Sequence, residues 1–207
     1  MTIATLRSPS IGNLRQRALA AAHRMLETRG EAGMTLRALA AELNTGAGGL
    51  YHHFAGKDAL LAELAIDGFA ELGRWMAMAS DAPPPGRTPF NACAHAYLGF
   101  TRHRPALYAI MYNERILAGH AGVRRAETAA FEVFRRSLDR HGAACASADD
   151  LALTFWALGR GVASISCRAD SDRPGAAKDI VARVMNGLEA LTGRPLALVA
   201  QIAEDAA

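Results

Sequence analysis

The chain has 207 residues, of which 51% are hydrophobic and 21% are charged, and its formal net charge at pH 7 is +3. These values indicate a soluble globular chain of one or two domains, without the run of roughly 18 to 20 apolar residues that a membrane-spanning helix needs. No disulfide framework or zinc site is expected, because Cys93, Cys145 and Cys167 are far apart and form no Cys-x-x-Cys pair. The N-terminus shows no signal-peptide pattern, so we expect a cytoplasmic protein with no membrane partner.

The excess positive charge lies in the first quarter of the sequence. Residues 1–58 hold seven basic and four acidic side chains, whereas residues 59–207 hold equal numbers of the two. Such asymmetry predicts an anionic partner for the N-terminal part of the chain. Alanine is frequent and β-branched alternation is scarce, so the predicted fold class is all-α, with about nine helices.

The first four predicted helices follow from apolar residues that recur at helical spacing. They cover about 13–29, 36–43, 47–54 and 57–79. Thr35 can cap the second helix, and Asn44 and Gly46 favour a tight turn before the third. Two short helices joined by such a turn, behind a supporting helix, form a helix-turn-helix pattern at about 34–53. These elements together form a predicted N-terminal domain.

A larger C-terminal domain is predicted over residues 83–200, and it begins with the Pro-rich segment 83–86. Its helices are expected at about 89–103, 105–112, 123–141, 147–168 and from Pro174 onward. Residues 117–122 are predicted to be a loop.

Three spaced segments of the N-terminal domain resemble one known family. The segments TLRALA (35–40), GGLYHHF (48–54) and KDALL (57–61) are similar to the N-terminal domain of TetR (tetracycline-repressor) family transcriptional regulators. The resemblance implies an N-terminal domain of residues 11–71. The resemblance implies a homodimer that binds palindromic double-stranded operator DNA and responds to a small-molecule effector in its C-terminal domain. It also implies that five residues contact DNA, mostly its backbone: Thr35, Arg37, Tyr51, His53 and Lys57.

The predicted recognition helix departs from the usual family sequence. Asn44-Thr45-Gly46 stands where the family has Gly-Val-Ser, and Gly49 stands where it has Thr. Few of its side chains can read base edges, so we expect DNA shape to supply much of the selectivity. The candidate DNA-binding residues are Thr35, Arg37, Thr45, Gly46, Ala47, Gly48, Gly49, Tyr51, His52, His53 and Lys57.

The C-terminal domain resembles the TetR subgroup whose ligand domain carries a Trp-His-Gly motif. The segments at 96–100, 104–108 and 156–161 carry this likeness, with Arg160 at the position of the motif histidine. Small-molecule pockets are mostly apolar, although aromatic residues at helical spacing are more often plain core. The effector-pocket candidates are Tyr97, Phe100, Met111, Tyr112, Phe155, Trp156 and Arg160.

The last two long helices carry apolar stripes and small residues that favour a four-helix interface with a second copy of the chain. The histidines are scattered without the spacing of a metal site, and we predict no catalytic residue, metal or cofactor. The protein is therefore predicted not to be an enzyme. The alternative is a helical small-molecule carrier or enzyme that uses only the C-terminal cavity, and salt-dependent DNA binding would separate the two.

Overall fold

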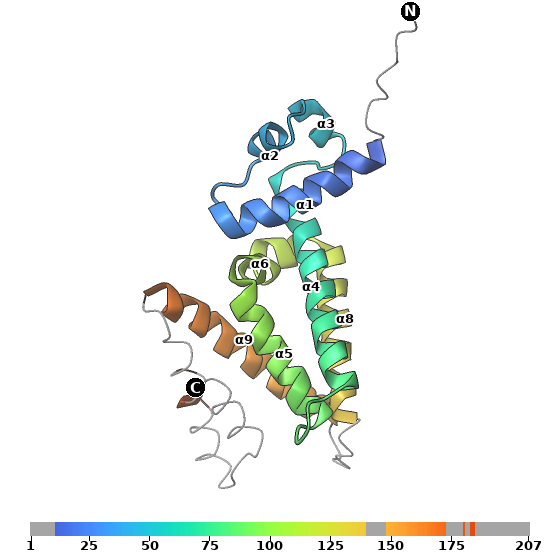
Figure 1. Ribbon diagram of the computed structural model, residues 1–207, viewed down its shortest axis with the longest axis vertical. Helices are drawn as coiled ribbons and strands as arrows, with labels where there is room; N and C mark the ends of the chain where they lie inside the picture. Colours follow the sequence, from blue (N-terminus) through green and yellow to red (C-terminus); the bar gives the residue numbers. More distant parts are fainter. Residues whose placement is uncertain (1–10, 140–147, 173–179, 181–182, 185–207) are drawn as a thin grey trace, which may run out of the picture. The chain divides into compact units, whose positions relative to one another are not determined.

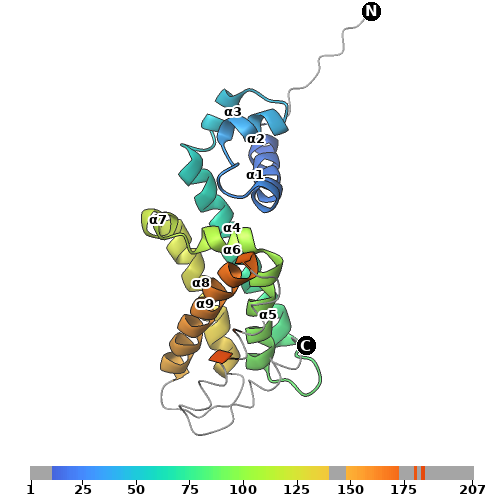
Figure 2. The ribbon, with the colours of Figure 1, turned by 90° about the vertical axis from the view of Figure 1, so that its left-hand side faces the viewer.

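The computed structural model describes residues 11–139, 148–172, 180, 183 and 184 (Figures 1 and 2). These residues form nine α-helices and no β-strand, which confirms the all-α class. The helices are α1 (Ile11–Arg29), α2 (Leu36–Glu42), α3 (Ala47–Tyr51), α4 (Lys57–Asp81), α5 (Pro89–His103), α6 (Pro105–Met111), α7 (Glu114–Gly119), α8 (Ala121–Asp139) and α9 (Ala148–Asp172). None of the described helices is long and apolar enough to cross a membrane.

The helices divide between two compact units. The first consists of residues 1–68 and 106–125, and the second of residues 69–105 and 126–207. The first unit therefore holds α1, α2, α3, α6 and α7 with the beginnings of α4 and α8. The second holds α5, α9 and the remaining parts of α4 and α8.

The core of the first unit forms where α1, α2 and α3 meet the start of α4. Met25, Leu39, Leu50, Phe54 and Leu61 are all buried there. On α1, α2 and α4 the buried apolar residues recur about one helical turn apart, so each of these helices turns one face toward the core. The short helices α2 and α3 depend on this packing, because isolated helices of their length are unstable in water.

The third helix is shorter than predicted. It ends at Tyr51 rather than near Phe54, and His52 is its C-terminal cap. The backbone N–H groups of His53 and Phe54 both donate to the carbonyl oxygen of Leu50, at 3.0 and 2.9 Å. The chain thus tightens after Tyr51 and turns Phe54 into the core.

The prediction of a loop at 117–122 is wrong. Residues 114–119 form α7, and α8 begins at Ala121 after the single cap residue His120. The side chain of Asn113 accepts hydrogen bonds from the N–H groups of Arg115 and Ile116, which starts the helix. Ile116 is completely buried, so tertiary packing stabilises a helix of six residues that is too short to be stable alone.

The second unit has an aromatic core between α5, α8 and α9. The Trp156 ring lies 5.3 Å from Tyr97, 5.6 Å from Phe131 and 5.7 Å from Phe134, measured between centroids. The offset and edge-on arrangement of these rings is the favourable one for aromatic pairs. The helix predicted to begin at Pro174 lies almost entirely outside the described residues.

Candidate nucleic-acid interface

A capped helix, a tight turn and a second short helix form the centre of the candidate interface (Figure 1). The hydroxyl of Thr35 accepts a hydrogen bond of 3.0 Å from the N–H of Ala38 at the start of α2. Asn44 has a φ of 50°, the left-handed conformation that the sequence predicted for this turn. The N–H of Thr45 donates to the carbonyl oxygen of Ala40 over 3.0 Å, which closes the turn.

The predicted DNA-binding residues differ in exposure. Tyr51 is an exposed aromatic residue, with 53% of its surface accessible. The other fully exposed members are Thr35, Arg37, Gly46, Gly48 and His52. The partly exposed members are Thr45, Ala47, Gly49, His53 and Lys57. Their exposure leaves polar and basic groups of α2 and α3 available to a partner, which is what contact with nucleic acid requires.

The basic residues near this interface fall into two groups. The guanidinium of Arg15 pairs with Glu63 at 2.7 Å, and Nζ of Lys57 donates to the carbonyl oxygen of Glu31 over 2.7 Å. Within the described residues, the guanidiniums of Arg17 and Arg37 make no ion pair or hydrogen bond. The two unpaired cations therefore carry the positive charge that is readily available to a phosphate.

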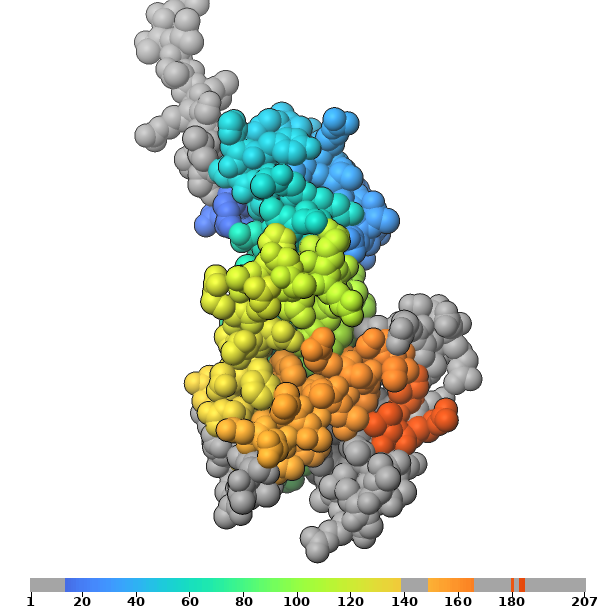
Figure 3. All heavy atoms as spheres, turned by 180° about the vertical axis from the view of Figure 1, so that it is seen from behind, coloured from blue at the N-terminus to red at the C-terminus, as the bar shows by residue number. Residues whose placement is uncertain are grey.

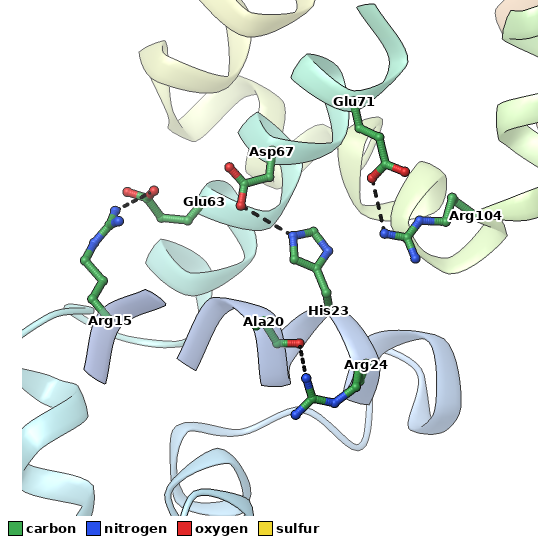
Figure 4. A network of polar contacts seen from close by, with 8 residues as sticks. All are labelled: Arg15, Ala20, His23, Arg24, Glu63, Asp67, Glu71 and Arg104. Carbon is green, nitrogen blue, oxygen red and sulfur yellow. Dashed lines mark hydrogen bonds and ion pairs between the residues drawn. The ribbon is translucent and has the colours of Figure 1, made fainter. Parts of the chain in front are cut away.

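Two polar contacts join helix α1 to the start of α4 (Figure 4). Arg15 pairs with Glu63, and one helical turn further along α4 Asp67 lies 3.4 Å from Nε2 of His23. These contacts are partly exposed, so each adds only a small stabilisation. They orient the supporting helix behind α2 and α3.

A further ion-pair network, which the sequence did not reveal, joins α7 to the connection between α1 and α2 and to the start of α4. Arg115 contacts Asp58, and its Nη2 lies 3.3 Å from Oε1 of Glu31. The hydrogen bond from Arg115 is the main reason that the pKa of Asp58 is lowered. Because Arg115 follows Glu31 by 84 residues, no local sequence pattern could have signalled the pair.

The candidate effector residues are divided between the units. Tyr97, Phe100, Phe155, Trp156 and Arg160 belong to the second unit, and Met111 and Tyr112 to the first. Tyr97, Phe100 and Trp156 are buried among other side chains. Arg160 is partly exposed, with its Nη1 3.5 Å from Oε1 of Glu127 on α8.

Burial shifts the pKa of two groups on α5. It raises the pKa of the Cys93 thiol to about 11, so this thiol is protonated at neutral pH. It lowers the pKa of His95 to about 4, with Arg87 and Arg102 adding to the effect. The described residues contain no group of three or more His, Cys, Asp or Glu side chains that could hold a metal ion.

The first unit has the arrangement of a helix-turn-helix DNA-binding protein, in which the second short helix enters the major groove. Residues 18–64 match the model of the bacterial regulatory proteins of the tetR family. Residues 90–205 match that of the tetracyclin repressor-like C-terminal domain. The chain belongs to the TetR family of DNA-binding transcriptional regulators.

Individual relatives agree with this assignment. The HTH-type transcriptional regulator YobS of Bacillus subtilis (strain 168) is 34% identical over 101 residues, or 49% of this chain. The matched region covers about half of that relative, 52% of its length. A TetR-family regulator from Pectobacterium atrosepticum has a TM-score of 0.69 at 25% identity, over 87% of this chain and 93% of its own. The structure of SmeT with triclosan shares the fold, with a TM-score of 0.54 at 18% identity, over 86% of this chain and 88% of its own.

Proposed function

We propose that this regulator is a repressor that binds a palindromic operator as a homodimer and releases it when a small molecule binds the C-terminal domain. The observation that carries the proposal is the exposed Arg37 on α2, which makes no ion pair or hydrogen bond with any described residue, together with the exposed Tyr51 at the end of α3. We assign DNA binding to a domain of residues 11–71 and effector binding to residues 83–200. The regulatory role leaves no place for catalysis, and we place the protein in the cytoplasm, where its DNA lies.

The proposed contacts are of two kinds: those to the DNA backbone, which position the protein, and those to base edges, which recognise the sequence. Four side chains are proposed to contact phosphate oxygens. They are the hydroxyls of Thr35 and Tyr51, the guanidinium of Arg37 and the ring of His53. Lys57 retains two N–H donors beyond the one that bonds Glu31, so it can still meet a phosphate. Thr45, Ala47 and His52 are the side chains proposed to reach base edges.

The dimer proposal is supported by the outer face of α9, which forms part of the surface in Figure 3. Leu153 is 60% exposed and Ile165 is 46% exposed on this helix. Between them, Ala157 and Gly161 are exposed at intervals of four residues, on the same side of the helix. An apolar stripe with small residues at its centre suits close packing against a second copy of α9.

The effector is proposed to bind in the second unit, where aromatic side chains predominate. Tyr97, Phe155 and Trp156 would supply apolar contacts, and Arg160 would supply a polar one. Arg160 would take the role of the histidine in the Trp-His-Gly subgroup, which we propose for this chain. SmeT, which shares the fold, was solved in a complex with triclosan, and this supports a small-molecule effector of unspecified chemistry.

Selection of bound fragments from a random duplex DNA pool tests the proposed function. We expect a palindromic consensus whose affinity falls steeply as salt rises, because bound phosphates release counterions. Failure to enrich any sequence, or binding without salt dependence, would favour a carrier that uses only the C-terminal domain. For the effector, Trp156→Ala should weaken the response of the complex to an inducing compound, and an unchanged response would remove Trp156 from the site.

A further inference from the structure

Two carboxylates lie beside the lysine that is proposed to contact a phosphate. Asp58 directly follows Lys57 in the first turn of α4. Nζ of Lys57 donates a hydrogen bond of 2.7 Å to the carbonyl oxygen of Glu31, so the second acidic residue borders the same amine. If these two negative charges were not compensated, they would repel the phosphates of an approaching duplex.

One arginine of α7 contacts both carboxylates. Arg115 forms an ion pair with Asp58, and its Nη2 lies 3.3 Å from Oε1 of Glu31. Lys57 and Arg115 carry two positive charges against the two negative ones, so the cluster of these four residues is neutral as a whole. Loss of the arginine would leave two negative charges against one positive charge.

The network adds little to the stability of the fold. Its ion pairs are exposed to solvent, with 51% of the side-chain surface of both Arg115 and Asp58 accessible. Pairs of that kind contribute little to the free energy of unfolding. Helix α7 also packs through Ile116, which is completely buried. What the network chiefly changes is therefore the electrostatic potential at the start of α4, where Lys57 and the helix dipole favour a phosphate.

We infer that Arg115 is a positioning residue for operator binding, because it neutralises the carboxylates of Asp58 and Glu31 beside the phosphate contact of Lys57. This inference rests on the proposed operator binding and deepens it. It places a determinant of DNA affinity on α7, outside the domain of residues 11–71 to which DNA binding is assigned. Arg115 acts through its two partners and needs no contact with DNA itself.

The test is a set of operator affinities in the full-length chain. The consensus operator is first selected with the wild-type protein, and dissociation constants are then measured at about 0.1 M salt for Arg115→Ala, Asp58→Asn and the double variant. Arg115→Ala should weaken binding by about five- to tenfold, because one carboxylate is left uncompensated near the phosphates. Asp58→Asn alone should bind at least as tightly as wild type. The double variant has a neutral cluster again and should return to within about twofold of wild type.

A purely structural role of Arg115 predicts the opposite pattern. Asp58→Asn also removes the ion pair, so if the link between α7 and α4 were what mattered, it would weaken binding as Arg115→Ala does. The double variant would then recover nothing. Salt provides a second readout, because a charge effect is screened and the loss caused by Arg115→Ala should shrink to about twofold at about 0.3 M salt. The inference is overturned if Asp58→Asn fails to restore binding, or if Arg115→Ala binds within about twofold of wild type at the lower salt concentration.

Arg125→Ala is the matched control, since it removes the same charge from an exposed arginine of the same unit. It should bind the operator within about twofold of wild type. An equal loss in this variant would show that only the net charge of the unit matters, and it would also overturn the inference. All variants are compared well below the Tm that circular dichroism gives for each. If the wild-type chain selects no DNA at all, operator binding itself has failed, which is a separate result.

Discussion

Arg115 at the start of α7 is joined to Glu31 in the connection between α1 and α2, with 3.3 Å between Nη2 and Oε1. The same guanidinium contacts Asp58 in the first turn of α4. One side chain therefore ties two segments of the DNA-binding unit to α7. Both partners belong to the first unit, so the network stiffens the unit from within.

Arg115→Ala should raise the pKa of Asp58 toward its ordinary value, because the arginine hydrogen bond is the largest cause of its depression. A carboxylate with a lowered folded pKa stabilises the protein above its unfolded pKa of about 3.9, and this contribution is lost as pH falls through the folded value. The free energy of unfolding of the variant should therefore fall less on acidification than that of the wild type. NMR titration of Asp58 measures the shift. Arg125→Ala, which removes an exposed arginine elsewhere in the unit, should leave the titration unchanged.

Gly68 is a position where a methyl group has no room. A Cβ there would lie 2.7 Å from Sδ and 2.9 Å from Cγ of Met111 on α6. Gly68→Ala should therefore reduce the free energy of unfolding by about 1 to 3 kcal/mol, as overpacking does. Urea denaturation measures the change.

Gly73→Ala, one and a half turns further along α4, is the control for this substitution. Its Cβ would be 3.9 Å from Val133, an ordinary contact, so alanine should add about 0.4 to 1 kcal/mol of stability. Equal effects of the two substitutions would contradict the close packing of α6 on α4.

Leu153→Glu should weaken the proposed dimer. The leucine is 60% exposed in the single chain, and a carboxylate buried there in the dimer would lose its hydration without gaining a partner. We expect the dimer dissociation constant to rise at least about tenfold, with the fold unchanged. Sedimentation velocity measures it. Met78→Glu, at a residue of α4 that is 73% exposed, is the control and should remain as dimeric as wild type.

His95 should make the protein less stable as pH falls below neutrality. Its folded pKa of about 4 lies below the ordinary 6.5, so the unfolded chain binds the proton first. Stability from this residue is present above about pH 6.5 and is lost as pH falls toward 4, by about 1 to 2 kcal/mol after allowance for partial exposure. His95→Gln should flatten this part of the urea-unfolding profile, whereas His103→Gln, at an exposed position on the same helix, should not.

The sequence correctly predicted those helices in which the periodic apolar residues and the residues typical of helix ends indicate the same bounds. Thr35 caps α2 and Pro89 opens α5, as predicted. The prediction failed at residues 117–122, because α7 is too short to be stable alone and depends on the burial of Ile116 in the folded protein. Helix propensity is a local property and does not reflect tertiary packing.

The sequence predicted the helix-turn-helix and its candidate residues, but not which of the basic side chains are paired in the folded protein. The basic residues near the helix-turn-helix pointed to an anionic partner, yet Arg15 is held by Glu63 and Lys57 by the backbone of Glu31. These partners come from other segments of the chain, so only the fold reveals them. Likewise the sequence did not reveal that Gly49 lies against Leu14 of α1, whereas a Cβ on Gly48 would have no described atom within 4 Å.

The placement of the tryptophans gives the two units different optical signals. Both Trp75 and Trp156 belong to the second unit, and they are the 2 tryptophans of the chain. Their fluorescence therefore reports the melting of the second unit alone, whereas far-ultraviolet circular dichroism reports helices in both. If the two transitions separate on heating, the difference measures how independently the DNA-binding unit unfolds.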